Sequence, residues 1–433
     1  MDVQRVLICV IPMGWWWRIE GRKMSKENKN IIVGLDIGTS KVVALVAELI
    51  PDGEFKVIGM GSQESMGLKK GVVVNIKQTV ETVSRVIQEV ELMADCKVSN
   101  VYTGIAGSHI RGFNSKGMVA INDKEVSSGD VERVIETAKA MPLSADQEIL
   151  HILAQEFIID GQGGVQEPIG MSGMRLEVLV HIITGAVSAA QNVLKCVRRC
   201  GLEVVDLVLQ PLASSYAVLS EDEKNLGVCL VDIGGGTTDI AVWTQGAVRH
   251  AAVIPIAGDQ ITNDIAIALR TPAREAEDIK CRYGSANANM VGSEEEIDVP
   301  GVDERPNRKL RRQTLAEVMQ PRIEELFELV HDELQRAGVA EILSSGIVLT
   351  GGASVIPGMT QLGEEIFHMP VRIGVPKYEG SLADVVQNPR FATAYGLLLE
   401  AQQQVRRGFV RVRRGSDVRQ MLGRVTSWLK KNF

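Results

Sequence analysis

The sequence lacks the patterns that mark several common classes of site. None of its six cysteines forms a CxxC pair and its six histidines are scattered singly, so neither a zinc site nor a disulfide framework is predicted. No GxxxxGK[ST] motif is present, which excludes a P-loop, and no GxGxxG follows a predicted strand, which leaves a Rossmann dinucleotide site unsupported. The cysteine usage fits a reducing, cytoplasmic compartment.

Long apolar runs are also absent. No run reaches about 18 apolar residues, so no segment is expected to span a membrane. The stretch Val6 to Trp17 is interrupted by Pro12 and Gly14 and has no cleavage site after it, so a signal peptide is not expected. Met24 is an alternative start, and residues 1–29 are predicted to be a disordered extension. The 433 residues that make up the chain are enough for two or more domains.

Glycine is plentiful, and its densest cluster is the first candidate ligand site. In the sequence VDIGGGTTDI, an apolar strand ends at Asp232 and another begins at Asp239, so the glycines lie in a hairpin turn. Glycines let peptide N–H groups approach an anion closely, and threonines add hydroxyl donors. A plain turn would have the same sequence, so the pattern alone leaves both interpretations open. The candidate phosphate contacts are Asp232, Gly234, Gly235, Gly236, Thr237, Thr238 and Asp239.

The chain repeats this arrangement 196 residues earlier, counting from Asp36 to Asp232. The sequence IIVGLDIGTSK again gives a strand, an aspartate and a hydroxyl-rich turn, and its candidate contacts are Asp36, Gly38, Thr39, Ser40 and Lys41. Such a duplication predicts two related domains that face each other across a cleft. A third apolar strand runs into Gly351, Gly352 and Ala353.

Helix and strand patterns place an additional segment in each half. Strands and a helix between residues 101 and 182 predict a small α/β insertion in the first half. Residues 259–338 carry three predicted helices and form a second insertion, in the second half. One of these helices holds Glu277 and Lys280 one turn apart, a spacing that is usual for a solvated ion pair.

These turns resemble those of the actin-like ATPase superfamily, which has an α/β, ribonuclease H-like two-domain fold. The resemblance implies that the two turns bind the phosphates of ATP, that Asp36 and Asp232 hold Mg²⁺ through water, and that Gly351 and Gly352 lie against the adenosine. It also implies a place for Glu277 and Lys280 beside the ribose. Gln210 would orient a hydrolytic water or serve a purely structural role.

The insertions give a closer resemblance, to the FtsA family of bacterial cell-division proteins. Its motifs extend from about Asn30 to Phe433 and include ELMADCKVSNVY, QEFIIDG, EPIGMSGMRLE and RQTLAEVMQPR. The resemblance implies a polymerising protein that binds FtsZ through the second insertion and recruits later division proteins, possible partners of the first insertion. The implied segments are an extension (1–29), subdomain 1A (30–100, 183–226 and 376–402), 1C (101–182), 2A (227–258 and 339–375), 2B (259–338), a linker (403–415) and a terminal helix (416–433).

The end of the chain predicts membrane binding. Residues 405–433 hold nine basic residues and one acid, a charge of +8 in a chain of net −7, so residues 1–404 carry −15. On a helical wheel the apolar residues from Val418 onward share one face, and the basic residues lie on the other. Such a helix suits the surface of an anionic bilayer better than the protein's own core. The predicted membrane contacts are Val418, Met421, Leu422, Val425, Trp428, Leu429 and Phe433, with Arg419, Arg424, Lys430 and Lys431.

The expected function is therefore an ATP-binding scaffold that tethers FtsZ filaments to the cytoplasmic face of the cell membrane at the septum, with at most a slow ATPase activity and no nucleic-acid partner. The alternative from another class is a metabolic kinase of the same superfamily, for which the basic tail would have no use. A pilus-assembly or rod-shape protein is a third possibility.

Overall fold

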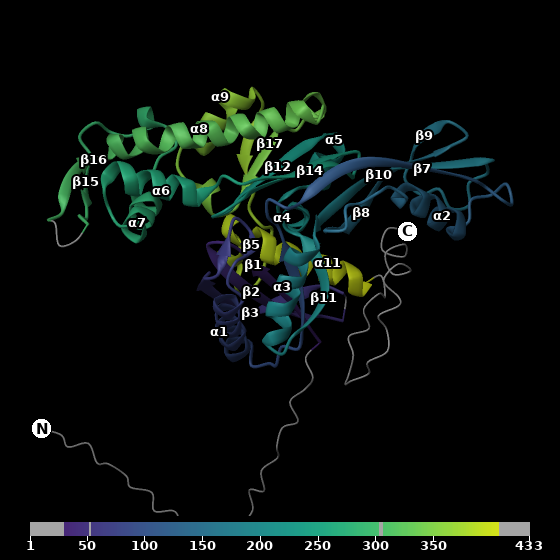
Figure 1. Ribbon diagram of the computed structural model, residues 1–433, viewed down its shortest axis with the longest axis horizontal. Coiled ribbons are helices and arrows are strands. Elements are labelled where there is room, and N and C mark those ends of the chain that lie inside the picture. The colour runs from purple at the N-terminus through teal and green to yellow at the C-terminus, as the bar shows by residue number, and fades with distance from the viewer. Residues whose placement is uncertain (1–29, 52, 303–305, 407–433) are drawn as a thin grey trace, which may run out of the picture.

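The computed structural model describes residues 30–51, 53–302 and 306–406 (Figure 1). Two five-stranded sheets form the centres of a lower and an upper half, with strand orders β11-β6-β1-β2-β3 and β14-β13-β12-β17-β18. The strands are β1 (Ile31–Ile37), β2 (Lys41–Leu49), β3 (Phe55–Glu64), β6 (Asn100–Ile105) and β11 (Glu203–Leu209) in the lower sheet, and β12 (Val228–Ile233), β13 (Thr238–Thr244), β14 (Ala247–Ile254), β17 (Ile347–Thr350) and β18 (Val371–Ile373) in the upper one.

The two sheets share one plan, as the duplicated motif predicts. In each, a buried apolar strand pairs antiparallel with the strand after the turn and parallel with a later strand: β1 with β2 and β6, and β12 with β13 and β17. Asp36 and Asp232 occupy the same position, near the end of the first strand. The two motif turns therefore lie at equivalent places, at the ends of β1 and β12.

Helices cover the lower sheet because their apolar residues recur at helical spacing. Helix α1 (Ile76–Ala94) is capped by Asn75, whose side chain accepts a hydrogen bond from the Gln78 amide, and it buries Val83, Val86 and Val90. Helix α3 (Val187–Arg199) packs beside it, and the short hairpin of β4 (Leu68–Lys69) and β5 (Val72–Val73) precedes α1.

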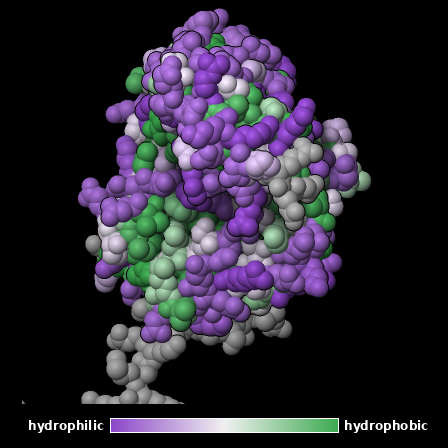
Figure 2. All heavy atoms as spheres, turned by 90° about the vertical axis from the view of Figure 1, so that its left-hand side faces the viewer, coloured by the Kyte–Doolittle hydropathy of each residue, from purple (hydrophilic) through white to green (hydrophobic). Residues whose placement is uncertain are grey.

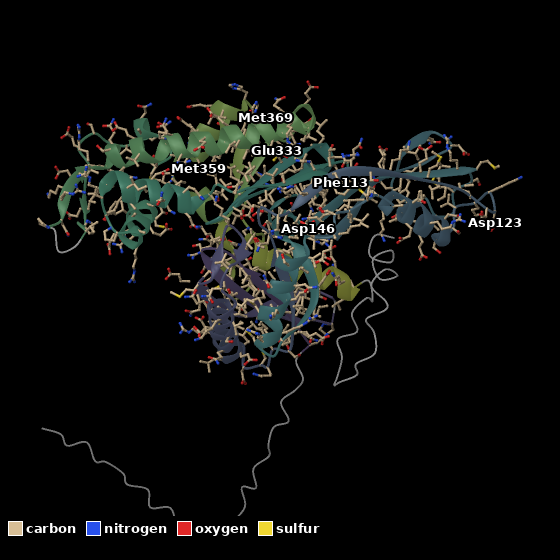
Figure 3. All side chains as sticks on the ribbon, in the orientation of Figure 1. Phe113, Asp123, Asp146, Glu333, Met359 and Met369 are labelled. Atoms are coloured by element: carbon tan, nitrogen blue, oxygen red, sulfur yellow. The ribbon has the colours of Figure 1, made fainter. Side chains whose placement is uncertain are left out.

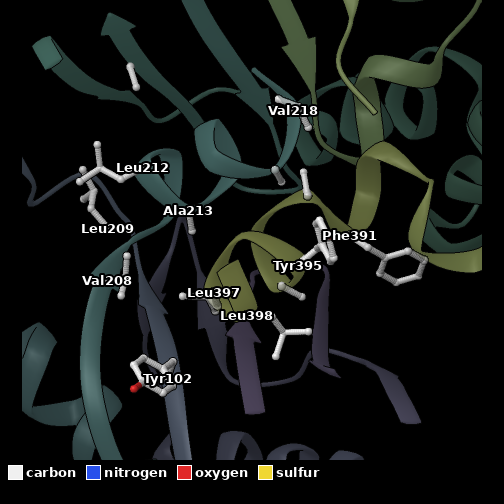
Figure 4. Packing of buried hydrophobic residues seen from close by; sticks show 14 of the residues in the cluster. Tyr102, Val208, Leu209, Leu212, Ala213, Val218, Phe391, Tyr395, Leu397 and Leu398 are labelled. Carbon is white, nitrogen blue, oxygen red and sulfur yellow. The ribbon is translucent and has the colours of Figure 1, made fainter. Parts of the chain in front are cut away.

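Two helices lie between the halves: α4 (Gln210–Val218) and α11 (Ala392–Arg406) (Figure 4). They contact closely because Gly396 has no side chain; a Cβ there would lie 1.8 Å from the Ala213 carbonyl oxygen. Leu212 and Leu397 belong to a core cluster that contains residues of both sheets. The segment before α11 contains α10 (Ala383–Val386) and the 3₁₀ turn η4 (Pro389–Phe391).

The first insertion, which we call the insert, leaves the lower half after β6 and lies beside the upper sheet, at the right of Figure 1. Its sheet has the order β7-β10-β8-β9, and one helix covers it. These elements are β7 (Arg111–Ala120), α2 (Ser128–Lys139), β8 (Gln147–Ile159), β9 (Gln162–Val165) and β10 (Arg175–Ala186). The predicted α/β character of this segment is confirmed.

The second insertion lies at the upper left of Figure 1. It contains α6 (Gly258–Leu269), α7 (Ala273–Tyr283), η1 (Ala288–Met290), β15 (Glu296–Val299), β16 (Arg308–Arg311) and α8 (Arg312–Arg336). The remaining upper elements are α5 (Glu221–Leu226), η2 (Ala340–Ile342), η3 (Gly352–Val355) and α9 (Met359–Phe367). Strands β15 and β16 pair antiparallel and form a hairpin that precedes α8.

The last helix is longer than predicted. The linker was expected to begin at residue 403, but α11 continues to Arg406. Gln404 donates hydrogen bonds to Asp206 (2.7 Å) and Glu400 (2.8 Å), and Arg406 pairs with Glu54 at 2.7 Å, so tertiary contacts stabilise a polar turn. The predicted extension (1–29) and nearly all of the predicted linker and terminal helix (407–433) lie outside the described residues. Within the described ranges, no helix is long and apolar enough to cross a membrane.

Candidate functional site

A cleft of about 370 Å³ separates the two halves, a size that suits a small-molecule ligand. In Figure 2 hydrophilic side chains surround the hollow between the upper and lower parts of the molecule. The cleft is lined by the predicted residues Asp36, Gly38, Thr39, Ser40, Lys41, Gln210, Asp232, Gly234, Gly235, Gly236, Thr237, Asp239, Glu277, Lys280, Gly351, Gly352 and Ala353.

Thr238 was predicted for this site but does not line the cleft. Successive side chains of a strand point to opposite faces, so Thr238 faces away from the cleft while Asp239 lines it. The Thr238 hydroxyl instead donates a hydrogen bond to the Ile256 carbonyl oxygen at 2.8 Å, which makes it a structural contact.

The turns of the two halves lie directly against each other. A Cβ built on Gly235 would be 2.7 Å from the Ser40 Cβ and 3.0 Å from Asp259 Oδ1, and one on Gly236 would be 2.6 Å from Thr39 Oγ1. These glycines are therefore required where backbone from one half meets side chains from the other. All three glycines of the upper turn line the cleft, and the Gly234 amide donates within the turn to the Thr237 carbonyl oxygen at 3.0 Å.

Three buried aspartates face this junction. Burial raises the pKa of Asp36 to about 7; the charge of Lys41 opposes this rise, and that of Asp232 adds to it. Burial likewise raises the pKa values of Asp232 and Asp239. Asp239 Oδ1 is buried and, among the described residues, has no hydrogen-bond partner. Among the described residues no three acidic, histidine or cysteine side chains are placed to bind one metal ion directly, so these aspartates suit a hydrated divalent cation such as Mg²⁺, held through water.

Side chains from the helices between the halves hold two of these aspartates. Gln210 Nε2, at the start of α4, donates to Asp36 Oδ1 at 2.9 Å. Ser214 Oγ, one turn further along α4, donates to Asp232 Oδ2 at 2.5 Å, and Thr393 of α11 adds a longer bond of 3.3 Å to the same oxygen. The orientation of the acidic group therefore depends on both helices that connect the halves.

Lys41 supplies positive charge on the lower side of the cleft. Burial and the neighbouring Arg390 lower its pKa to about 8, while Asp36 and Asp232 act in the opposite direction. Its ammonium group donates to the Arg390 carbonyl oxygen and lies 4.8 Å from the centre of the Phe391 ring. A half-buried lysine beside a glycine-rich turn is suited to an anionic ligand.

Glu277 and Lys280 are not the solvated pair that their spacing usually indicates. Lys280 is 7% exposed, and its Nζ donates to Glu277 Oε2 (2.6 Å), Thr262 Oγ1 (2.7 Å) and the Gly258 carbonyl oxygen (3.1 Å). Burial alone would raise the pKa of Glu277, but the charge and hydrogen bond of Lys280 lower it. The pair is thus fixed and lines the upper wall of the cleft.

The third glycine-bearing strand closes the cleft at the back. Gly351 has φ of +86°, and a Cβ there would lie 2.4 Å from Asp232 Oδ1, so backbone conformation and contact both require glycine. Sequence reasoning missed several lining residues, among them Gly71, Asp259, Asn388, Arg390 and Thr393. They come from separate elements that are far apart in the sequence. Among them only Asp259 stands where a sequence pattern is informative, because acidic residues favour the first turn of a helix, here α6.

Comparisons with known proteins agree with this architecture. The family model "Cell division protein FtsA" matches residues 229–396, and "SHS2 domain inserted in FTSA" matches residues 107–184, most of the insert. "Cell division protein FtsA" of Pseudomonas aeruginosa is 56% identical over 415 residues, which cover 94% of this chain and 100% of that protein. "Cell division protein FtsA" of Escherichia coli K12 is 46% identical, with coverage of 94% and 99%.

Solved structures show the fold. A chain of a "PilM-PilN type IV pilus biogenesis complex" has a TM-score of 0.61 at 18% identity, covering 86% of this chain and 98% of that one. MreB5 of Spiroplasma citri bound to ADP has a TM-score of 0.53 at 15% identity, covering 87% and 98%. The predicted actin-like α/β fold with an inserted subdomain is confirmed. The identities to full-length relatives set the kinase, pilus-assembly and rod-shape alternatives aside: the chain belongs to the FtsA family of cell division proteins.

Proposed function

We propose that the chain is an ATP-binding, polymerising scaffold that attaches FtsZ filaments to the cytoplasmic face of the cell membrane at the division septum and recruits later division proteins. The observation that carries the proposal is the single cleft in which equivalent turns of both halves meet around three buried aspartates. Because ligand binding there would join the two halves, it would set the conformation that is able to polymerise.

Each part of the cleft has a role in holding Mg·ATP. The Gly38–Lys41 and Gly234–Thr237 turns contribute N–H, hydroxyl and ammonium donors to the phosphates. Asp36 and Asp232 would hold a hydrated Mg²⁺ through water, with Asp239 as an additional acceptor, and the cation would supply positive charge against that of the phosphates. Glu277 and Lys280 lie beside the ribose, and Gly351, Gly352 and Ala353 beside the base. Gln210, bonded to Asp36, orients water for a slow hydrolysis that resets assembly.

Mg²⁺ binding should strengthen as pH rises. The cation binds the ionised Asp36, and since burial raises the pKa of that carboxyl to about 7, the binding form is lost as pH falls through 7. One proton released per cation predicts about tenfold tighter binding of Mg²⁺ at pH 8 than at pH 6. Calorimetry with Mg²⁺ and ATP in buffers of different ionisation enthalpy measures both the affinity and the proton release. Asp36→Asn should bind Mg²⁺ more weakly and release fewer protons, since Asp232 remains; equal affinities of the wild-type chain at the two pH values would refute the assignment.

Replacing Lys280 with methionine should weaken binding of a fluorescent ATP analogue by about tenfold, because the variant removes a buried positive charge from the upper wall of the cleft. The variant also leaves Glu277 without its main partner. The matched control is Arg282→Met on the same helix, because the Arg282–Asp278 pair is 65% and 47% exposed. The control should bind as the wild type does, since exposed ion pairs contribute little. Equal affinities of the two variants would remove Lys280 from the site.

Membrane attachment is assigned to residues 416–433. Each basic residue near an anionic leaflet contributes about 1 kcal/mol, so a single tail gives reversible binding. A filament presents many tails together, and this avidity raises attachment by about 10² to 10⁴ without any new contact. Polymerisation controlled by ATP would thereby control the time that the scaffold spends on the membrane.

In this proposal FtsZ binds the second insertion, and later division proteins bind the insert, which is the first insertion. The decisive experiment is reconstitution: fluorescent FtsZ is mixed with vesicles containing anionic lipids, with and without the purified chain and ATP. We expect FtsZ on the vesicles only when the full chain is present, and more of it with ATP. FtsZ that stays in solution while the chain itself binds the vesicles would contradict the tethering function.

A further inference from the structure

The insert is joined to the lower half by the chain but packs on the upper half. Gln155 of β8 donates hydrogen bonds from Nε2 to the carbonyl oxygens of Val248 (3.0 Å) and Arg249 (3.3 Å) on β14. Gly112 of β7 approaches so closely that a Cβ there would lie 2.7 Å from the Ala251 carbonyl oxygen. We call this contact between Gly112, Gln155 and His181 of the insert and residues 248–251 of β14 the seat.

The seat is buried, and polar groups of the insert face polar groups of the upper half there. Gln155 is 4% exposed and His181 1% exposed. His181 Nδ1 is 2.7 Å from Asn114 Oδ1. The ring of His181 contacts the ring of His250 edge-on, with 5.9 Å between the ring centres, and His250 Nε2 is 2.7 Å from Glu333 Oε1 of α8. In Figure 3 Phe113 and Glu333 lie near this junction, whereas Asp123 marks the far end of the insert. Separating the seat would leave buried carbonyl groups without partners, which is costly.

Where it leaves the lower half, the insert lies close to the lower phosphate turn. The Gly71 amide donates to Thr39 Oγ1 at 2.9 Å, and Gly71 lies against Gly107, where a Cβ on Gly71 would be 2.7 Å from the Gly107 Cα. Gly107 is in the connection from β6 to the insert. His151 of β8 also accepts a hydrogen bond from the Leu209 amide of β11 at 2.9 Å. The insert therefore contacts both halves. Gly107, where the chain enters the insert, touches Gly71, and Gly71 donates to Thr39 of the lower phosphate turn.

This arrangement ties the seat to the geometry of the cleft. Strand β14 pairs with β13, which begins directly after the upper phosphate turn, so β14 and that turn move as one sheet. The insert is fixed to the lower half at both of its roots, before β7 and after β10. A rotation of the halves about α4 and α11 would thus shift β14 against the insert, and the seat would keep its hydrogen bonds only when the two turns are in contact.

We propose that the insert links the two halves across the cleft and that its seat on β14 is energetically coupled to the bound nucleotide. This inference rests on the proposed binding of ATP between the turns. ATP, which carries one more phosphate than ADP for the two turns to bind, would favour the seated arrangement more than ADP does. Because coupling is reciprocal, loosening the seat must weaken ATP more than ADP.

Two variants loosen the seat without touching the cleft. Gly112→Ala introduces the Cβ that meets Ala251, and Gln155→Leu removes the donated hydrogen bonds at nearly constant volume. Gly129→Ala is the matched control, since a Cβ there would have only Ser127 Oγ within 4 Å, at 3.7 Å. For the full-length chain, the ratio of the ADP to the ATP dissociation constant is measured by calorimetry. Hydrogen exchange of residues 247–254 is followed with each nucleotide.

We expect either seat variant to lower this ratio at least fivefold, the lower end of typical coupling, and to remove the extra protection of β14 that ATP gives the wild type. The control should keep both. Wild-type values of the ratio and of the exchange pattern in Gln155→Leu would overturn the link, whatever the stability of Gly112→Ala. A wild-type chain that binds no nucleotide would instead overturn the proposed function, and the link with it.

Discussion

Gly235→Ala is expected to weaken Mg·ATP binding by between about 5-fold and 150-fold. The new Cβ would lie 2.7 Å from the Ser40 Cβ and 3.0 Å from Asp259 Oδ1, so the two turns must separate. Overpacking of this kind costs about 1 to 3 kcal/mol, and the cost falls on the arrangement that binds the phosphates. Calorimetric titration of the purified variant with ATP in excess Mg²⁺ measures the loss.

The control variant is Gly129→Ala, because a Cβ at Gly129 has no close contact. It should bind Mg·ATP as tightly as the wild type. If Gly235→Ala also bound with wild-type affinity while remaining folded by circular dichroism, the contact between the turns would have no part in nucleotide binding.

Removal of residues 415–433 is expected to abolish co-sedimentation with anionic vesicles while leaving ATP affinity within about twofold, because the apolar face and the cationic face of the predicted helix are lost together. These residues lie outside the described part of the chain, so the expectation rests on their sequence pattern. Sedimentation assays with and without vesicles, at matched protein concentration, measure the effect.

Two further variants separate the contributions of the tail. Replacing Leu422 and Trp428 with glutamate removes the apolar contribution and should release the chain from anionic vesicles. Replacing Lys430 and Lys431 with glutamine should weaken binding less and lower its salt dependence, since each charge contributes about 1 kcal/mol. Persistent sedimentation of the deletion variant would show that another surface binds lipid.

Much of the framework was predictable because it is local in sequence. The repeated strand, aspartate and glycine turn indicated two equivalent sheets, and β1 and β12 do pair with their neighbours in the same way. Apolar residues at helical spacing between residues 77 and 94 indicate helix α1, which buries Val83, Ile87 and Val90 of that set, whereas Leu92 is 86% exposed. These features depend on backbone conformation and alternation of side chains, which a sequence records directly.

What the sequence did not reveal depends on contacts between distant segments. The glycines of the upper turn pointed to an anion, whereas in the structure they also admit Ser40 and Thr39 of the other half. Ser214 and Thr393 both donate to Asp232, although they lie 179 residues apart in the sequence and on different helices. The last turn of α11, polar in sequence, is helical because Gln404 and Arg406 find partners in the lower half. No local pattern contains such information.

The proposed function requires that equivalent turns from both halves bind one nucleotide between them. This can be checked in an experimental structure of the full chain with Mg²⁺ and a non-hydrolysable ATP analogue. We expect phosphates between Gly38–Lys41 and Gly234–Thr237, and Mg²⁺ within one water of Asp36 and Asp232. Phosphates bound to only one of the two turns, or a nucleotide outside this cleft, would contradict it.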